Sequence, residues 1–452
     1  NEPFDHSGNH NIMDVDKVIN LEALRASFKS FKAYSSPGMD GVYPALIQQG
    51  MDIIEDDLLK LYRRSFKAGY NPLTWLDTKV VYIPKPGKKD YTDPKSVRPI
   101  CLGSIFLKGL ERIIHWDLTE KELRTKLNRN IFSYREGVGC EDAIHNLVST
   151  VEKALENNEH CMVLFCDMDA AFSSASITGM VKTLQNIGAP IQTVVWTEQM
   201  LRNRKVTAFI NGESATKITN RGTPQGGVGS ANKWNVIKDD LHLRFPANWP
   251  TILNVFADDS HAIAVGKDEK DCANNIQATI EIMEKWAKDH NLKFNSSKTK
   301  VMMFSRKRNP KKPDIFMYGE KIEYVSEYKY LGVTITDDLS WKKHIEKTAQ
   351  RATFTMMNCK KMMSKSWGTN PRISRWLYMS LVRPLMMYAG LIWIKSLDVD
   401  AHVDMLERVQ RRGCLAILNA MHTTPTAGME VMLNIPPIEI YIQEQAMNTY
   451  KR

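Results

Sequence analysis

The sequence predicts an α+β protein in which a small sheet has helices on one face and a separate helical part follows. Short apolar segments such as MVLFCD and VFADDSHAIAV alternate with amphipathic helical patterns, which is typical of this fold class. Beyond Asp338 the pattern changes to long helices rich in Met, Trp, Lys and Arg. Because 452 residues are too many for one ordinary core, we expect roughly two to four subdomains.

Local patterns predict the individual elements. Apolar residues at helical spacing predict helices over residues 15–33, 45–66 and 273–290, and over most of 101–155. β-branched and aromatic runs predict strands at 80–83, 162–167, 301–304 and 328–335, and a hairpin at 255–265. A further helix should follow Asp167, with Ser174 or Ser176 as its N-cap.

Composition limits the classes of function. The net charge of +10 favours a polyanionic partner without naming one. No run of about eighteen apolar residues occurs, so we expect no membrane span. The seven cysteines show neither a CxxC pair nor zinc spacing, which favours reduced thiols in an intracellular compartment. The N-terminus lacks Met and any signal pattern, so we expect a piece of a longer polypeptide.

Acidic residues end two of the predicted strands. Asp167 follows MVLFC, and Asp258 and Asp259 occupy the hairpin tip. A β-turn alone explains adjacent aspartates, because Asp tolerates turn geometry. In a small sheet, however, Asp167 can lie beside that tip, and three carboxylates repel one another unless cations neutralise them. Oxygen ligands favour Mg²⁺, and two ions about 3.5–4 Å apart suit in-line phosphoryl displacement.

Two basic residues in the N-terminal part are candidates for binding a nucleoside triphosphate. Lys85 follows the predicted strand VVYIP, and Arg98 begins the segment RPI. Arg would bind phosphate through a bidentate fork and Lys as a point charge. Solvated surface charge is the simpler interpretation of each residue taken singly.

An ordered series of segments resembles the successive motifs of a reverse transcriptase. FCDMDAAF, RGTPQGG, FADD, NSSKTK and YKYLGV occur in that order between residues 165 and 333. Upstream, SPGMDGVYPALI, VVYIPKPGK, RPICLGSIFLKGLERII and FSYREGVGCEDAI resemble the fingers of non-LTR, LINE-type retrotransposon enzymes. Downstream, RRGCLAILNAMHTTPTAGMEVMLNIPPIEI resembles the segment that precedes an RNase H region in such polyproteins.

The resemblance implies a right-hand polymerase with fingers, a palm that holds a small antiparallel sheet, and a helical thumb. We expect an N-terminal helical extension over 1–34 and fingers over 35–160. The palm, with the primer grip, should cover 161–337, with 185–215 in part belonging to the fingers. A helical thumb and connection should cover 338–452.

The resemblance also assigns site residues. Asp167 and Asp258 match the metal-binding carboxylates, Asp259 is the neighbouring acid, and the carbonyl of Met168 is a candidate further ligand. Lys298 matches a candidate general acid for the departing pyrophosphate, although a lysine before a strand is more often simply exposed.

Two further segments match nucleotide-binding elements of the family. Phe172 matches the aromatic steric gate that rejects a ribose 2′-OH, with ordinary core as the alternative. Gln225 and the backbone around Gly226 match the loop that contacts the new base pair and the nucleotide sugar. The segment YKYLGV matches the primer grip.

The implied function is an RNA-directed DNA polymerase of a non-LTR retrotransposon, which extends a primer 3′-OH with dNTPs by two-metal nucleotidyl transfer. Its cofactors would be two Mg²⁺ ions, for which Mn²⁺ can substitute. Its partners would be an RNA template and a DNA primer, with no membrane. The endonuclease of such a polyprotein, and an RNase H where one exists, would lie outside this chain. An active element would work in the cytoplasm and nucleus.

Departures from the family pattern leave a second interpretation open. The apolar segment that usually follows TPQGG is replaced by one containing Gly229, Ala231, Asn232 and Lys233. A buried lysine must find a partner or reach solvent, because an unpaired one costs several kcal/mol. A catalytically impaired nucleic-acid-binding scaffold would fit a loosened helix here. An intron-encoded splicing cofactor shares the fold, but the C-terminal segment favours the retrotransposon type.

Overall fold

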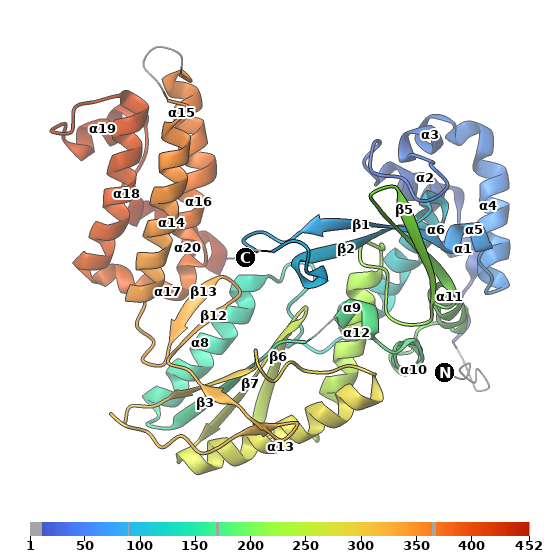
Figure 1. The fold of residues 1–452 in the computed structure, drawn as a ribbon, viewed down its shortest axis with the longest axis horizontal. Coiled ribbons are helices and arrows are strands. Elements are labelled where there is room, and N and C mark those ends of the chain that lie inside the picture. The colour runs from blue at the N-terminus through green and yellow to red at the C-terminus, as the bar shows by residue number, and fades with distance from the viewer. Residues whose placement is uncertain (1–10, 89, 169–170, 364–367, 452) are drawn as a thin grey trace.

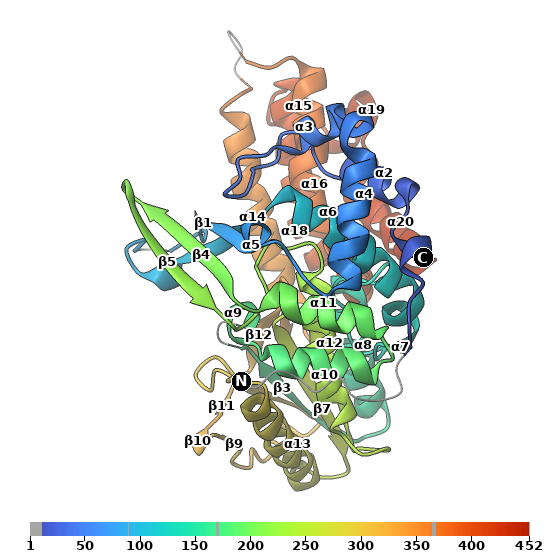
Figure 2. The same ribbon diagram turned by 90° about the vertical axis from the view of Figure 1, so that its right-hand side faces the viewer.

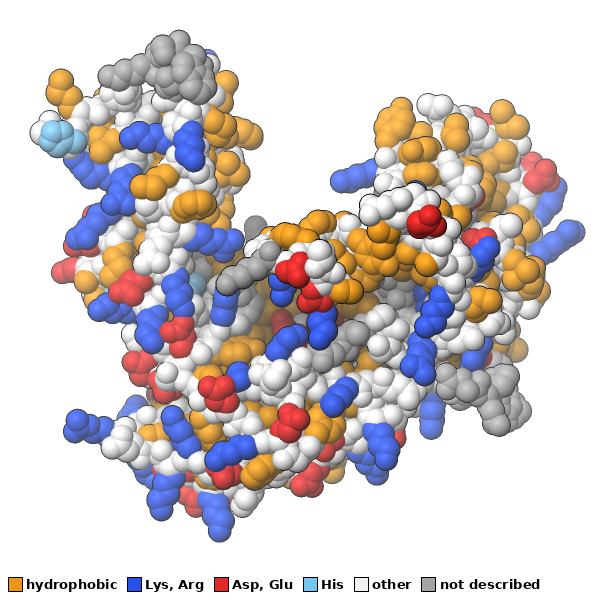
Figure 3. Space-filling view, viewed as in Figure 1, with side chains coloured by type: hydrophobic (Ala, Val, Ile, Leu, Met, Phe, Trp, Pro, Cys, Tyr) orange, Lys and Arg blue, Asp and Glu red, His pale blue; other side chains and the backbone are white. Residues whose placement is uncertain are grey.

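The computed structural model describes residues 11–88, 90–168, 171–363 and 368–451. In Figure 1 the C-terminal helices form a column on one side, the N-terminal helices form a block on the other, and a sheet lies below and between them. The space-filling view in Figure 3 is deeply hollowed between the column and the block. Residues 1–10 of the expected N-terminal extension, and Asp169 and Ala170 of the segment FCDMDAAF, lie outside the described residues.

The N-terminal block contains five short or medium helices: α1 (Val15–Val18), α2 (Leu21–Lys29), α3 (Pro44–Gln49), α4 (Met51–Lys67) and α5 (Leu73–Leu76). The single helix predicted over 15–33 is wrong, because Asn20 accepts a hydrogen bond from the Ala23 amide (2.8 Å) and starts a new helix. The helix predicted over 45–66 is divided at Gly50.

A four-stranded sheet projects from this block in the order β2-β1-β4-β5. Its strands are β1 (Asp77–Pro84), β2 (Val97–Leu102), β4 (Arg204–Ile210) and β5 (Glu213–Thr219). The strand predicted at 80–83 is confirmed as part of β1. The hairpin β4–β5, which extends away from the body in Figure 2, was not predicted. Its β4 strand pairs in parallel with β1, from Asp77↔Lys205 to Val80↔Ala208.

Helices connect this sheet to the central one: α6 (Ile105–Leu118), α7 (Arg124–Lys126), α8 (Cys140–Glu156), α9 (Ala171–Ser174), α10 (Ile177–Asn186), α11 (Ile191–Leu201) and α12 (Ser230–Leu243). A π-helical turn at Thr119–Leu123 links α6 to α7. The helix predicted after Asp167 is confirmed as α10, and Ser176 is its cap, accepting from the Gly179 amide (3.2 Å).

The central sheet has five strands in the order β11-β8-β3-β7-β6. They are β3 (His160–Cys166), β6 (Thr251–Phe256), β7 (Asp259–Gly266), β8 (Lys300–Phe304) and β11 (Glu323–Tyr324). Every residue of β3 is buried. Its side chains alternate between a core with α10, α12 and α13 (Glu269–Asp289) and a core with α8 and the C-terminal helices. The expectation of helices on one face is therefore wrong, as the unbroken apolar run of β3 indicates.

The C-terminal column is helical, as predicted. It consists of α14 (Lys342–Lys360), α15 (Pro371–Leu377), α16 (Arg383–Met387), α17 (Gly390–Trp393), α18 (Asp400–Leu418), α19 (Thr426–Leu433) and α20 (Ile438–Tyr450). Within the described part of the chain no single helix has the length and composition to cross a membrane. The helical segments Pro371–Met387 and Gly390–Asp398, which are bent by 50° relative to each other, have the length and composition of a span only when they are taken together.

The segment YKYLGVTI forms a hairpin rather than the single strand predicted. Its strands are β12 (Glu327–Tyr330) and β13 (Val333–Thr336), and β9 (Phe316–Met317) with β10 (Glu320–Lys321) makes a smaller hairpin before it. Leu331 and Gly332 turn the chain with positive φ values of 44° and 90°. Tyr328 stacks on Phe165 of β3 at 4.2 Å, so the expected primer grip is fixed to the central sheet.

Candidate active site

The three carboxylates that the sequence singled out meet at one end of the central sheet. β3 and β7 are antiparallel neighbours with Cys166 opposite Ser260, so the next residues along the two strands are Asp167 and Asp259. Phe256 pairs with Asp259, which leaves Asp258 in the two-residue turn between β6 and β7. Sequence reasoning therefore predicted both the hairpin and the meeting of its acids with Asp167.

A tight turn holds Asp258. Ala257 adopts a left-handed conformation with φ 52°, and its carbonyl accepts a hydrogen bond from Trp234 Nε1 of α12 at 2.9 Å. One carboxylate oxygen of Asp258, Oδ1, is buried and has no hydrogen-bond partner among the described residues. An acceptor that is buried and unpaired is costly, so this oxygen is suited to a cation.

The electrostatics of the site also favour a cation. Burial raises the pKa of Asp258, and the charge of Asp167 raises it further. The pKa of Asp259 rises to about 6 because it is buried and because Asp167 and Asp258 repel its negative form. Like charges that share a site disfavour one another's ionisation. The carboxylate oxygens of the three residues are therefore suitable ligands for a divalent metal ion.

Lys298 contacts one of these carboxylates directly. Its Nζ lies 2.6 Å from Asp167 Oδ2, with a side chain 60% exposed. The loop that carries Lys298 is fixed beside the site, because the Asn295 amide donates to the Asp167 carbonyl at 2.9 Å. Among the described residues, no group of three or more His, Cys, Asp or Glu side chains is arranged to hold a metal ion.

Phe172 lies beside the RGTPQGG loop. The Thr223 amide donates to the Phe172 carbonyl at 2.8 Å. Gly222, at φ 63°, approaches so closely that a Cβ there would be 2.3 Å from the same oxygen. The Phe172 ring is half-buried and lies 5.5 Å from that of Trp234. The ring therefore packs against the core and remains partly accessible.

The remaining part of this loop follows the edge of β2. The Cys101 amide donates to the Gln225 carbonyl at 2.7 Å. Gly226, at φ 108°, lies against the same residue, since a Cβ there would be 3.1 Å from the Cys101 carbonyl oxygen. The structure thus places Gln225 and Gly226 between the four-stranded sheet and α12.

Lys85 directly follows β1 of the four-stranded sheet, and Arg98 lies in β2. Lys85 Nζ donates to the Lys95 carbonyl at 2.9 Å within its own loop. Arg98 is exposed on β2 opposite Ile83 of β1. No contact of either residue with the carboxylates is seen, and their role in binding triphosphate stays a prediction.

The lysine that departs from the family pattern after TPQGG has a buried partner, Glu111, which the sequence analysis did not identify. Buried Lys233 Nζ lies 2.7 Å from Glu111 Oε1 of α6. The same carboxylate accepts from the Val228 amide (3.0 Å) and the Gly229 amide (3.1 Å). It therefore caps the N-terminus of α12, which has no side-chain cap of its own.

Asn232 also has a partner at this junction, because its side-chain amide donates to Thr119 Oγ1 at 3.3 Å. The helix is thus joined to α6 and the turn after it, and the expected loosening is not seen. The sequence signal for the missing partner of Lys233 was a glutamate on the apolar face of α6, since Glu111 lies between Leu110 and Ile114 on that face.

Comparison with known proteins agrees with this geometry. A family described as reverse transcriptase (RNA-dependent DNA polymerase) matches residues 83–335. The chain belongs to the reverse transcriptase family. The match extends over most of the predicted fingers and palm, including all three aspartates, and shows the right-hand polymerase fold that the sequence predicted. Members of this family generally use divalent metal ions.

Individual relatives come from the non-LTR retrotransposons that the sequence resembles. The 115 kDa protein of the type-1 retrotransposable element R1DM of Drosophila melanogaster is 26% identical over 427 residues, which cover 94% of this chain and 41% of the relative. The RNA-directed DNA polymerase from mobile element jockey of the same species is 24% identical over 447 residues, covering 96% and 48%. The chain thus spans less than half the length of these relatives.

Solved structures give a more distant likeness. The apo telomerase of Candida Tropicalis, truncated from its C-terminal domain, aligns with 63% of this chain and 58% of its own at 12% identity and a TM-score of 0.39.

Proposed function

We propose that this chain is an RNA-directed DNA polymerase that extends a primer 3′-OH with dNTPs on an RNA template. The observation that carries the proposal is the meeting of Asp167, Asp258 and Asp259 at the end of β3 and β7, in a chain of the reverse transcriptase family. In Figure 1 the β6–β7 hairpin lies in the central sheet below β1 and β2, and Figure 3 shows the hollow between the helical column and the N-terminal block. A template–primer duplex in this hollow would present its 3′ end to the carboxylates.

The carboxylates would hold two Mg²⁺ ions, or Mn²⁺ in their place, with the Met168 carbonyl as a further ligand. When bound, the ions supply charge that stabilises the attacking and leaving oxygens of an in-line displacement. Asp258 offers the buried oxygen without a partner. Lys298 is exposed beside Asp167, where it would donate to the leaving pyrophosphate as a general acid.

The rest of the chain would position the nucleic acid. Basic side chains gather on the helical column in Figure 3, and α14 alone contains Lys342, Lys343, Lys347, Arg351 and Lys360. Lysine and arginine on such a surface neutralise backbone phosphates irrespective of sequence. Gln225 and Gly226 would contact the new base pair, and Lys85 and Arg98 the triphosphate. An active element would place this activity in the cytoplasm and nucleus.

Primer extension by the native chain tests the proposal. We expect DNA synthesis on an RNA template with dNTPs and Mg²⁺, no synthesis when EDTA removes the metal, and much less with ribonucleotides. Binding of the template–primer without synthesis, in both Mg²⁺ and Mn²⁺, would contradict the proposal and favour the scaffold. Lys233 is paired with Glu111, and Asn232 is hydrogen-bonded to Thr119. These contacts remove the observation that favoured a scaffold.

Substitution of Phe172 by alanine should relax sugar selection. Removing the ring would open the space that a ribose 2′-OH needs, so the preference for dNTP over rNTP should fall by at least about tenfold, the range that one steric contact provides. The ratio of kcat/KM for single incorporation of the two nucleotides measures this. Phe172→Tyr keeps the ring and should keep the preference; an unchanged ratio in a destabilised alanine variant would mean that Phe172 is ordinary core.

Metal binding should depend on pH in a defined direction. Asp259 must lose its proton to bind a cation, and its pKa is raised to about 6. Mn²⁺ affinity should therefore be constant above about pH 7 and fall by up to about tenfold per pH unit below about pH 6, because one proton is then released for each ion bound. Calorimetric titration of the protein without nucleic acid, from pH 5 to pH 8, measures it. An affinity constant down to pH 5 would contradict this assignment.

A further inference from the structure

A lysine lies fully buried close to the carboxylates. Lys238 of α12 has no exposed surface. Its Nζ donates to Ser260 Oγ at 3.0 Å and to Met168 Sδ at 3.1 Å. Ser260 follows Asp259 and Met168 follows Asp167, so the ammonium contacts the neighbour of a catalytic carboxylate on each of β3 and β7.

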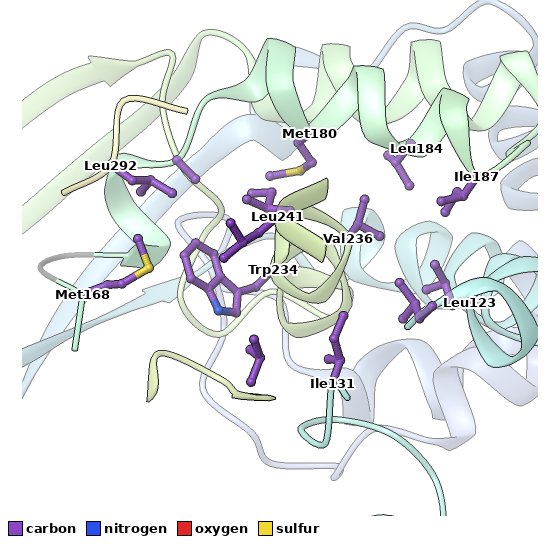
Figure 4. Close-up of a cluster of buried hydrophobic side chains, with 14 of the residues drawn as sticks. Leu123, Ile131, Met168, Met180, Leu184, Ile187, Trp234, Val236, Leu241 and Leu292 are labelled. Atoms are coloured by element: carbon purple, nitrogen blue, oxygen red, sulfur yellow. The ribbon is translucent and has the colours of Figure 1, made fainter. Parts of the chain in front are cut away.

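Neither of these acceptors carries a charge. The surroundings of the ammonium are otherwise aromatic, with the rings of Trp234, Trp286 and Phe294 at 5.2, 5.5 and 5.8 Å. Figure 4 shows Met168 and Trp234 in the apolar cluster around α12. A buried cation ordinarily needs a paired anion. Here the negative charges that stabilise it are those of Asp258, Asp259 and Asp167, and burial lowers its pKa only to about 8.

The position within α12 excludes a purely solvated role. Trp234 and Leu241 on the same helix are fully buried, and Lys238 lies one turn after the first and one turn before the second. A lysine at this place in an apolar stripe is the sequence signal that could have identified it.

We propose that Lys238 is a positioning residue of the catalytic centre, whose buried ammonium balances part of the charge of Asp167, Asp258 and Asp259 and thereby sets how strongly they bind divalent metal. This inference rests on the proposed function. The ammonium reduces the mutual repulsion of the carboxylates in the metal-free protein and repels an incoming cation. Its removal should therefore tighten metal binding, whereas a residue that only fills the core would leave the affinity unchanged or weaken it.

The test is Mn²⁺ binding to the metal-free chain, without nucleic acid, by calorimetry and by the electron paramagnetic resonance of free Mn²⁺. In Lys238→Met we expect the Kd for Mn²⁺ to fall by at least about tenfold, because neighbouring charges at an effective dielectric constant of about 20 change affinities by such factors. Met has a similar length and no charge, so it changes the volume of the buried side chain little. Lys238→Gln is a second neutral variant and should give the same direction.

Two further variants serve as controls. Lys238→Arg keeps the positive charge and should stay within about threefold of the native Kd. Lys285→Met removes one charge from an exposed position of α13 and should also leave it unchanged. Neutral variants that are folded by circular dichroism and bind Mn²⁺ no more tightly would overturn the inference alone. A native chain that binds no Mn²⁺ would overturn it together with the proposed function.

Discussion

The Asp258→Asn variant should bind template–primer and fail to extend it. Asn keeps the shape of the side chain but loses the charge of the oxygen that is buried at the hairpin tip without a partner. We expect kcat to fall by at least about a thousandfold, which corresponds to about 4 kcal/mol of transition-state stabilisation. Single-turnover primer extension on an RNA template in saturating Mg²⁺ measures it.

Binding should separate this loss from misfolding. The Kd for template–primer should change by less than about threefold, since removing a negative charge does not weaken attraction to a polyanion. Asp56→Asn, an exposed aspartate on α4, is the matched control and should retain native activity. Synthesis above about a tenth of the native rate in Asp258→Asn would disprove the assignment of Asp258 to the metal site. Removal of one metal ligand should leave far less activity than that.

The central sheet and its acids were predictable because their signals are local. MVLFCD ends an apolar run with a carboxylate, and VFADDSHAIAV contains both strands of its own hairpin and the turn. Pairing of β3 with β7 then brings Asp167 to that turn without any further condition on the sequence. The order of the family segments supplied what local patterns lack, which is a candidate chemical role for each residue.

The unpredicted features depend on contacts between distant segments. β5 has the sequence ESATKIT, in which six of seven residues are exposed, so no apolar alternation marks it as a strand. It forms because β4 pairs with β1 from more than a hundred residues away. Glu111 and Lys233 each look misplaced in an apolar helix until α6 and α12 are brought together. Lys238 is a similar case, because the carboxylates that stabilise its charge lie on two other segments, at the end of β3 and at the β6–β7 tip.

The Glu111–Lys233 pair should be among the most costly contacts to break. In Lys233→Met the carboxylate of Glu111 stays buried without its counter-ion, since Glu111 is 4% exposed. Burial raises the pKa of Glu111, yet Lys233 and the amides of Gly229 and Val228 hold it below its usual value. We expect the variant to lose about 3–5 kcal/mol of unfolding free energy, the range for a broken buried pair. Urea unfolding followed by circular dichroism measures it.

The double variant Glu111→Gln with Lys233→Met shows whether the pair itself or the packing causes this loss. Gln carries no charge and keeps one oxygen, which can accept from only one of the Val228 and Gly229 amides because these bond to different oxygens of Glu111. The double variant should therefore recover about half of the lost stability. A single variant within about 1 kcal/mol of the native chain would mean that Glu111 is relieved by protonation or by water, and that the ion pair is not what holds α12 to α6. Because α12 follows the loop of Gln225 and Gly226, the single variant should also raise the KM for dNTP, and the double variant should restore it.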